Sequence, residues 1–317
     1  VTYLEARVPV IPSLKEERYA SYKASLMRYE FTLAHNYYHG NLRVYSYATV
    51  CRNIYSNLYD LTKAETKALK GYLKKLNLHA SDVVLNIREI ENRVKAEIVI
   101  SEELKATAPL DEILRLKQTN KYGATRLMVN LLNLAGIDFR IVATCDKDER
   151  AFDPDFNGWN YLDDYVIYFP GLHQYILPDN PFYRLGVNAS QYQGVYGLFL
   201  KPLHYGETFH TFAWEVDRLP VDSYEQNTDS LFINLKAEPE TGNLQASIRR
   251  VFTGELAASY QSFWQLIPEE RRKEAMEPIF SMANQQTDIT SYTLTHASPS
   301  DMGIHPLIWN VSLTARS

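Results

Sequence analysis

Cysteine is scarce in this 317-residue chain: only Cys51 and Cys145 are present, and two thiols do not make a disulfide framework. No apolar run approaches the roughly eighteen residues needed to cross a bilayer, so the sequence predicts no membrane-spanning segment. Lysine and arginine form no cluster longer than short pairs, and the net charge is −5. A nucleic-acid partner is therefore not expected, because it requires a basic face.

The features of a leader peptide are also missing. The chain begins at Val1, without an initiator methionine, a charged segment or an apolar core. This start is typical of a fragment or a processed product, so any signal peptide is expected to lie outside the sequence.

What the chain has is a composition suited to packing. The hydrophobic content is 45%, enough for an ordinary core, and the length predicts roughly two domains. The 23 tyrosines are numerous, and tyrosine commonly lines the surfaces that bind sugars and peptides.

The clearest pattern lies between residues 117 and 143. Thr119 or Asn120 is placed to cap a helix, and Gly136 stands where a left-handed residue ends one. The β-branched, alternating stretch from Phe139 to Ala143 predicts a strand. Between them, apolar residues recur at helical spacing on one face: Ala124, Leu127, Met128, Leu131, Leu132 and Ala135. The sequence therefore predicts a buried helix, a glycine stop and a strand.

This unit resembles the transglutaminase-like core, the bacterial branch of the papain-like cysteine protease fold. Members of that family carry a run such as G-x-C-[KR]-D-x-A-x-L-L-x-x-L-L-R-x-x-G-I-x-A-R, with the nucleophilic cysteine at the start of the helix. The second half is kept here, from Ala124 to Ile137. In the first half, Asn120 stands at the cysteine position, Gln118 replaces a glycine and Tyr122 replaces an aspartate. The resemblance implies the family's scaffold with its nucleophile lost.

Residues 162–180 resemble the hairpin on which the family carries its histidine and aspartate. Asp164 then occupies the histidine position, and Asp179 lies within one residue of the aspartate position. An alternative alignment through residues 159–161 supplies no imidazole either. In a Cys–His–Asp triad the imidazole takes the thiol proton and the carboxylate orients the imidazole. Asn120, Asp164 and Asp179 cannot perform that relay, so no catalytic residue is expected.

The loop before this hairpin has the spacing of a calcium-binding loop. Ligand positions 1, 3, 5 and 12 of such a loop, and its glycine at position 6, fall on Asp153, Asp155, Asn157, Asp164 and Gly158. Pro154 and the short aspartate at the last position depart from the pattern, so a polar loop held by Asx turns is the alternative. Calcium is the one cofactor that the sequence suggests.

The order of predicted elements indicates an α+β protein in three parts. Residues 1–40 hold two strand-like runs, Tyr3–Ile11 and Leu26–Leu33, and are expected to end an upstream β-domain or form a β-arm. Residues 41–205 are predicted to be the transglutaminase-like core, with helices packed on an antiparallel sheet. Residues 206–317 run as strands, two helices and strands, which predicts a smaller β-rich α+β domain with its helices on one side. This order resembles the domain that follows such cores in bacterial multidomain surface proteins.

The resemblance favours a catalytically inactive module that binds a ligand or has a structural role at the cell envelope, in the periplasm or at the cell surface. Its old cleft would bind a peptide, protein or glycan through four residues: Trp159, Tyr161, Asp164 and Tyr165. A purely architectural spacer is a further alternative.

The enzyme alternative is an active cysteine protease or amidase of the same superfamily, with Cys145 or Cys51 as a non-standard nucleophile. Cys145-Asp-Lys-Asp imitates the family signature, but it follows a strand, whereas the signature opens a helix.

Overall fold

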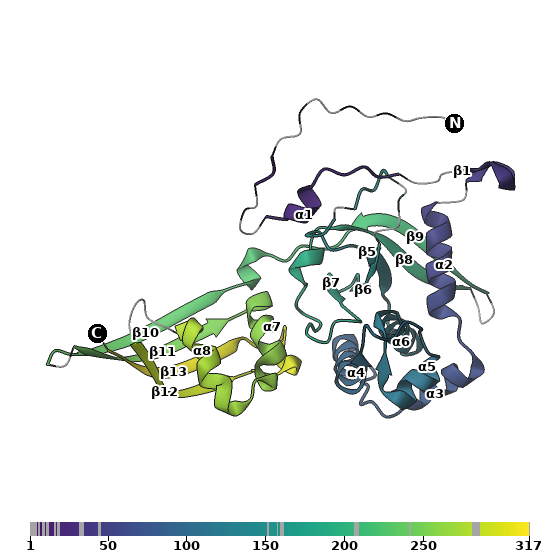
Figure 1. Ribbon diagram of the computed structural model, residues 1–317. Coiled ribbons are helices and arrows are strands. Elements are labelled where there is room, and N and C mark those ends of the chain that lie inside the picture. The colour runs from purple at the N-terminus through teal and green to yellow at the C-terminus, as the bar shows by residue number, and fades with distance from the viewer. Residues whose placement is uncertain are drawn as a thin grey trace.

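The structure, a computed structural model, describes residues 21–31, 35–43, 46–150, 152–156, 162–205, 209–240, 242–280 and 286–316, with Gly158 and scattered positions before residue 21. It is an α+β protein whose two larger sheets, of five and four strands, are antiparallel and each packed against its own helices (Figure 1). Among the described residues, no helix is both long enough and apolar enough to cross a bilayer.

The helices of the first part precede its sheet. They are α2 (Tyr47–Tyr59), α3 (Lys63–Leu73), α4 (Val83–Glu97), α5 (Leu110–Leu116) and α6 (Lys121–Leu134). Thr62 and Glu65 form a capping box at the start of α3, with each side chain bonded to the other residue's backbone N–H. The predicted α6 is confirmed: the Asn120 side chain caps it, and Gly136 follows its end at φ 72°.

The five-stranded sheet has the order β7-β6-β5-β8-β9. Its strands are β5 (Arg140–Thr144), β6 (Asp164–Phe169), β7 (Gln174–Ile176), β8 (Tyr196–Tyr205) and β9 (Phe209–Arg218). One face, with Ile141 and Leu198, packs on α2 and α6, while Val142 and Phe199 on the other face pack under the loops after β7 and β9. Burial on both faces explains why the three middle residues of β5, the central strand, are all apolar.

The expected domain boundary between residues 205 and 206 falls inside a hairpin. β9 pairs with β8 over its whole length, from Tyr196 opposite Arg218 to Tyr205 opposite Phe209. The strand over 209–218 therefore belongs to the first sheet, and the second sheet begins at β10 (Asp229–Glu238). An alternating sequence shows that a strand has two faces, but it does not identify the sheet in which the strand pairs.

The segment before α2 contains little regular structure in its described part. It has α1 (Tyr22–Ser25) and the short pair β1 (His35–Asn36) and β2 (Leu42–Arg43). The strand predicted over residues 26–33 is not formed in its described part, residues 26–31, where the Arg28 side chain donates to the carbonyls of Lys23 and Ala24. Most of the predicted strand over residues 3–11 lies outside the described residues.

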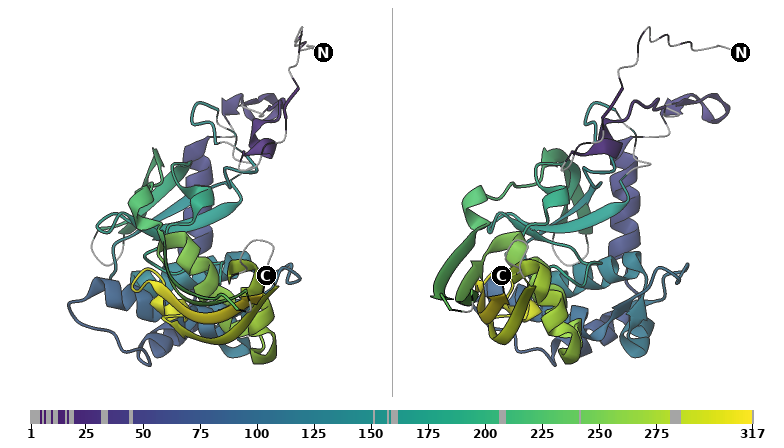
Figure 2. Two further views of the ribbon diagram at one scale, coloured as in Figure 1. Left: turned by 90° about the vertical axis from the view of Figure 1, so that its left-hand side faces the viewer. Right: turned by 60° about the vertical axis from the view of Figure 1, so that its left-hand side comes forward.

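The C-terminal part is a four-stranded sheet with helices on one face, as predicted. Its order is β10-β11-β13-β12, with β11 (Asn243–Phe252), β12 (Gln286–Thr295) and β13 (Leu307–Arg316). Helices α7 (Gly254–Phe263) and α8 (Arg272–Phe280) cover one face around Trp309, which packs against Trp264 at a ring distance of 4.7 Å (Figures 1 and 2).

The two parts meet at a buried polar contact. The Arg88 guanidinium, from α4, donates to the Leu185 carbonyl at 2.6 Å and to the Met302 carbonyl at 3.1 Å. Beside it the backbones of Gly186 and Gly303 approach so closely that neither position has room for a Cβ atom. The first and second parts are therefore packed through their main chains.

Candidate functional site

Asn120 lies at the start of α6. It directly follows β4 (Gln118–Thr119), which pairs parallel with β3 (Val99–Ile100). Its side-chain oxygen accepts from the Gly123 N–H at 2.9 Å and the Thr107 hydroxyl at 3.0 Å. Its amide nitrogen donates to the Leu104 carbonyl at 3.2 Å. Asn120, which the resemblance aligns with a cysteine, thus caps the helix and ties the preceding loop to it.

Lys121, one residue further on, lies between the carboxylates of Asp164 and Asp179. Its ammonium forms an ion pair with the Asp164 carboxylate and lies 3.6 Å from that of Asp179. Asp164 begins β6 and Asp179 follows β7, so the hairpin brings both carboxylates to the start of α6. Their side chains are 18% and 21% exposed. The two aspartates therefore converge on a lysine instead of on Asn120.

Lys121 and the nearby Tyr192 both hold their protons at neutral pH. Burial lowers the pKa of Lys121, but its bond to Asp164 and the charges of both aspartates outweigh that effect and raise it. Burial raises the pKa of Asp179, and the Lys121 charge opposes only part of that rise. Burial and the Asp164 charge raise the pKa of the Tyr192 hydroxyl. Lysine and phenol are thus both protonated, and neither is suited to act as a general base.

Both thiols are in the environment of unreactive cysteines. Cys51 is fully buried, and burial raises its pKa to about 12. Cys145 lies at the end of β5, where burial and the nearby Asp164 charge raise its pKa to about 11. A thiol attacks as the thiolate, and a raised pKa keeps that form rare.

A groove of about 380 Å³ lies beside the start of α6, between α2 and β6. Tyr165 and Tyr122 form one wall, with their rings edge to face at 6.2 Å. Among the described residues of the lining, Asp163 is the one with a formal charge; the others, besides the two tyrosines, are Val50, Asn53, Ile54, Asn57 and Leu162. Asn53 and Asn57, one helical turn apart on α2, are both exposed.

Tyr122 lines this groove, and its hydroxyl is buried without a hydrogen-bond partner in the described part of the chain. Among the described residues, its oxygen is one of a few buried side-chain polar atoms that lack a partner. Burial raises the pKa of Tyr122 to about 12, so the group is a neutral phenol. A buried unpaired hydroxyl costs free energy, and such groups in folded proteins usually have a partner in water or a ligand.

The predicted binding residues are only partly accounted for. Tyr165 lines the groove, whereas Asp164 is turned to Lys121 and its neighbour Asp163 faces the groove instead. Trp159, Tyr161 and the calcium-loop residue Asn157 lie outside the described residues.

In the predicted calcium loop, the described carboxylates of Asp153 and Asp164 are bonded to other groups of the chain. Asp153 accepts the Asp155 N–H at 2.9 Å, which is an Asx turn, and a calcium ion would compete with Lys121 for Asp164. In the described ranges no three His, Cys, Asp or Glu side chains converge as a metal site. Calcium binding stays a prediction.

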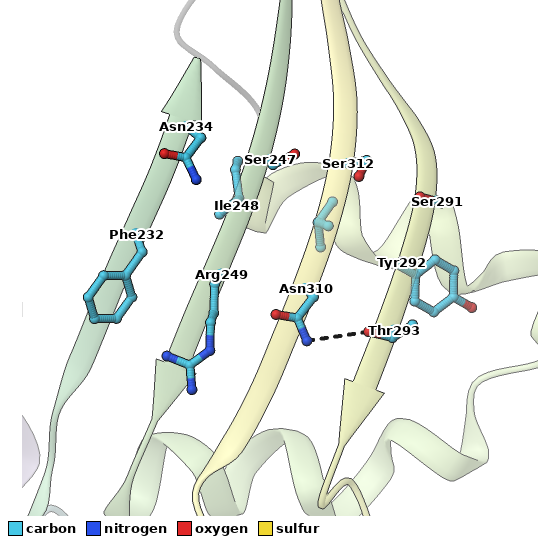
Figure 3. A pocket seen from close by; sticks show the side chains of 11 residues that line it. Phe232, Asn234, Ser247, Ile248, Arg249, Ser291, Tyr292, Thr293, Asn310 and Ser312 are labelled. Atoms are coloured by element: carbon cyan, nitrogen blue, oxygen red, sulfur yellow. Dashed lines mark hydrogen bonds between the residues drawn. The ribbon is translucent and has the colours of Figure 1, made fainter. Parts of the chain in front are cut away.

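A second hollow, of about 570 Å³, lies on the helix-free face of the C-terminal sheet. Its strand register places hydroxyl, amide and guanidinium groups in rows across the sheet. Figure 3 shows one such row, Phe232, Arg249, Asn310 and Thr293, in which Asn310 donates to Thr293. This is the solvent face of a two-layer sheet, where polar residues are expected.

Lys121 is the residue that the sequence analysis missed. It stands at the [KR] position of the quoted pattern, one residue after Asn120, but the spacing alone does not say which of residues 120 and 121 turns toward the hairpin. Comparison with known proteins adds nothing further: no family model, curated protein or solved structure matches the chain.

Proposed function

We propose that this chain is a degenerate transglutaminase-like module that binds a polypeptide segment in the groove between α2 and β6, and that it works by binding and not by thiol chemistry. The observation that carries the proposal is the lining of that groove, where the exposed Asn53 and Asn57 stand beside the paired rings of Tyr122 and Tyr165. A ligand with backbone amides and an apolar side chain would satisfy both kinds of group.

The chemistry of the lining suits a peptide. The carboxamides of Asn53 and Asn57 each offer a donor and an acceptor, which match the N–H and C=O of a backbone. The rings of Tyr122 and Tyr165 offer flat apolar surface for a side chain. Since Asp163 is the one charged residue that the described part of the chain contributes to the lining, the ligand is expected to be neutral or basic.

The absence of thiol chemistry is supported by the start of α6. An amide cap stands at the nucleophile position, and a protonated lysine lies between the two aspartates that replace histidine and aspartate. Both cysteines are buried with raised pKa. An exported, cell-envelope setting follows from the family resemblance alone, because fold and site do not fix a location.

The test is a screen of the purified chain against a random peptide array and a glycan array, followed by calorimetry on the best peptide. Asn53→Ala removes one carboxamide that is exposed in the groove and is expected to weaken peptide binding by about tenfold. Asn133→Ala is the matched control, because Asn133 is also a helical asparagine but is not among the residues that line the groove. Equal affinities in the two variants, or glycan hits without peptide hits, would contradict the proposal.

The hydrolase alternative is tested on the same material. Release of an amine from a peptide amide by the pure chain, abolished in Cys145→Ala or Cys51→Ala, would replace the binding proposal with an enzyme. We expect no saturable labelling of either thiol by an iodoacetamide-tagged peptide, because both thiols are buried.

A further inference from the structure

Strand β10 is an edge strand with both of its faces open to solvent. It pairs on one side with β11 and is the first strand of the sheet order. Its apolar residues alternate along the strand, and they remain exposed: Leu231 at 51%, Ile233 at 42% and Leu235 at 57%. A long, exposed and apolar edge strand is what folded proteins usually avoid, since it invites pairing with another strand.

These side chains lie on the same face as α7 and α8 but beyond their reach. In the ladder Ile233 is opposite Ile248, and Leu235 is opposite Ala246, both buried under the helices. The helices contact β12 and β13, and the described core beneath them takes residues from β11, β12 and β13 and none from β10. The stripe of Leu231, Ile233 and Leu235 therefore extends the apolar face of the sheet past its helical cover.

We propose that β10 pairs antiparallel with β10 of a second copy of this chain, with Ile233 facing Ile233 across a two-fold axis. The two four-stranded sheets then join edge to edge. Leu231 of each copy lies opposite Leu235 of the other, and six aliphatic side chains form one stripe across the axis. Such an isologous contact is the commonest form of dimer.

The charges of β10 favour this register. Asp229 falls opposite Ala237, and Lys236 falls opposite Ser230, so no two like charges meet. A shift of one residue would place Asp229 opposite Glu238 at both ends. It would also place the apolar face of one copy against the polar face of the other, because successive side chains point to opposite faces.

The two-fold axis through Ile233 also joins the helix-free faces of the two sheets. Phe232 and Asn234, which point to the helix-free face in Figure 3, would face each other across the junction. The hollow lined by Arg249 and Asn310 would then continue from one copy to the next, with the helices of both copies on the opposite side. The contact is independent of the groove beside α6. Ten residues per strand make a small interface, so the dimer is expected to depend on concentration.

The test is the mass of the chain in solution by light scattering, up to about 100 µM, a range suited to a weak interface. The wild type is expected to approach the dimer mass. Ile233→Lys is expected to remain a monomer, because it places two ammonium groups at the axis. Ile304→Lys is the matched control, because Ile304 is 51% exposed and lies outside β10, and it is expected to dimerise like the wild type.

Variants that each introduce one cysteine into β10, in addition to the buried Cys51 and Cys145, test the register. Under copper-phenanthroline and air, Ile233→Cys is expected to form a disulfide between copies, since facing residues lie about 5 Å apart. Leu231→Cys alone is expected not to, because it faces Leu235. A wild type that stays monomeric, a dimer that survives Ile233→Lys, or preferential cross-linking through Leu231→Cys would each overturn the proposal. If the wild type is a monomer, the exposed stripe of Leu231, Ile233 and Leu235 would instead be a surface for a different protein.

Discussion

Lys121 holds two carboxylates at the start of α6, and a substitution there can separate its charge from its packing. Lys121→Met keeps most of the side chain and removes the ion pairs with Asp164 and Asp179. The lysine is 45% exposed, so solvent screens the loss and we expect about 1 kcal/mol of destabilisation at pH 7. Lys23→Met, which breaks a fully surface pair with Glu149, is the control and is expected to cost nearly nothing.

The pH dependence of Lys121→Met has a defined sign. The Lys121 charge lowers the pKa of Asp179 against the effect of burial, so its loss raises that pKa further. An acid whose pKa is raised in the folded state destabilises the fold above that pKa, and this cost disappears as the pH falls and the carboxyl takes up a proton. Urea unfolding is therefore expected to show a smaller deficit at about pH 4 than at pH 7. A deficit that grows towards acid would show that the aspartates do not depend on the lysine.

At the residue scale the sequence predicted more of the site's positions than of its chemistry. The alignment proposed that Asp164 and Asp179 correspond to residues that gather near the helix start, and they do lie there. The partner was not predicted, because nothing in a spacing pattern says whether residue 120 or 121 turns toward the hairpin. The Tyr122 hydroxyl was also unforeseen, since an unpaired group is a property of packing in three dimensions.

At the scale of elements, Glu65 joins three helices. Its carboxylate accepts from the Thr62 N–H at 2.8 Å at the start of α3, the Leu110 N–H at 3.0 Å at the start of α5, and Arg126 of α6 at 2.6 Å. Its side chain is 3% exposed. Burial raises the pKa of Glu65, but these bonds outweigh burial and lower it to about 2.

Glu65→Gln is therefore expected to destabilise the chain by about 3 kcal/mol at pH 7. A carboxyl whose pKa is lowered by folding stabilises above its unfolded pKa, and that stabilisation is lost as the pH falls toward the folded value. The difference between wild type and Glu65→Gln should thus shrink between about pH 5 and pH 2. Glu103→Gln, an exposed position, serves as the control in the same denaturation series. A constant difference across that range would mean that packing, and not charge, accounts for the effect.

The capping box that forms part of this junction could be predicted from Thr62 and Glu65 alone, because the two residues are three apart and bond locally. The bonds from Glu65 to Leu110 and Arg126 could not, since they join positions far apart in the chain. The same limit explains the strand over 209–218. Its alternation was evident, but pairing with β8 depends on a hairpin turn and not on the strand's own pattern.

At the scale of the whole molecule, one of the contacts that join the two parts is main-chain packing that only glycine permits. A Cβ at Gly303 would lie 2.6 Å from the Gly186 Cα and 2.8 Å from the Leu185 carbonyl oxygen. That carbonyl is one of the two that Arg88 binds, so a shift of either backbone also strains the arginine's bonds. The sequence contained no sign of this contact, because two isolated glycines predict turns and not each other.

Gly303→Ala measures how much this contact contributes. Gly303 has φ 70°, so alanine there costs about 1–2 kcal/mol in backbone strain before any clash. Gly136→Ala isolates that strain, because Gly136 has φ 72° and nothing within 4 Å of its Cβ position. Overpacking adds about 1–3 kcal/mol at Gly303 and nothing at Gly136. Gly303→Ala should therefore lower the free energy of unfolding by that much more than Gly136→Ala does. The excess should appear in denaturant unfolding as separation of the transition into two steps, as the two parts lose their contact before either sheet melts. If both variants lose the same stability in a single step, the glycines tolerate a methyl group, and the junction contributes little to holding the parts together.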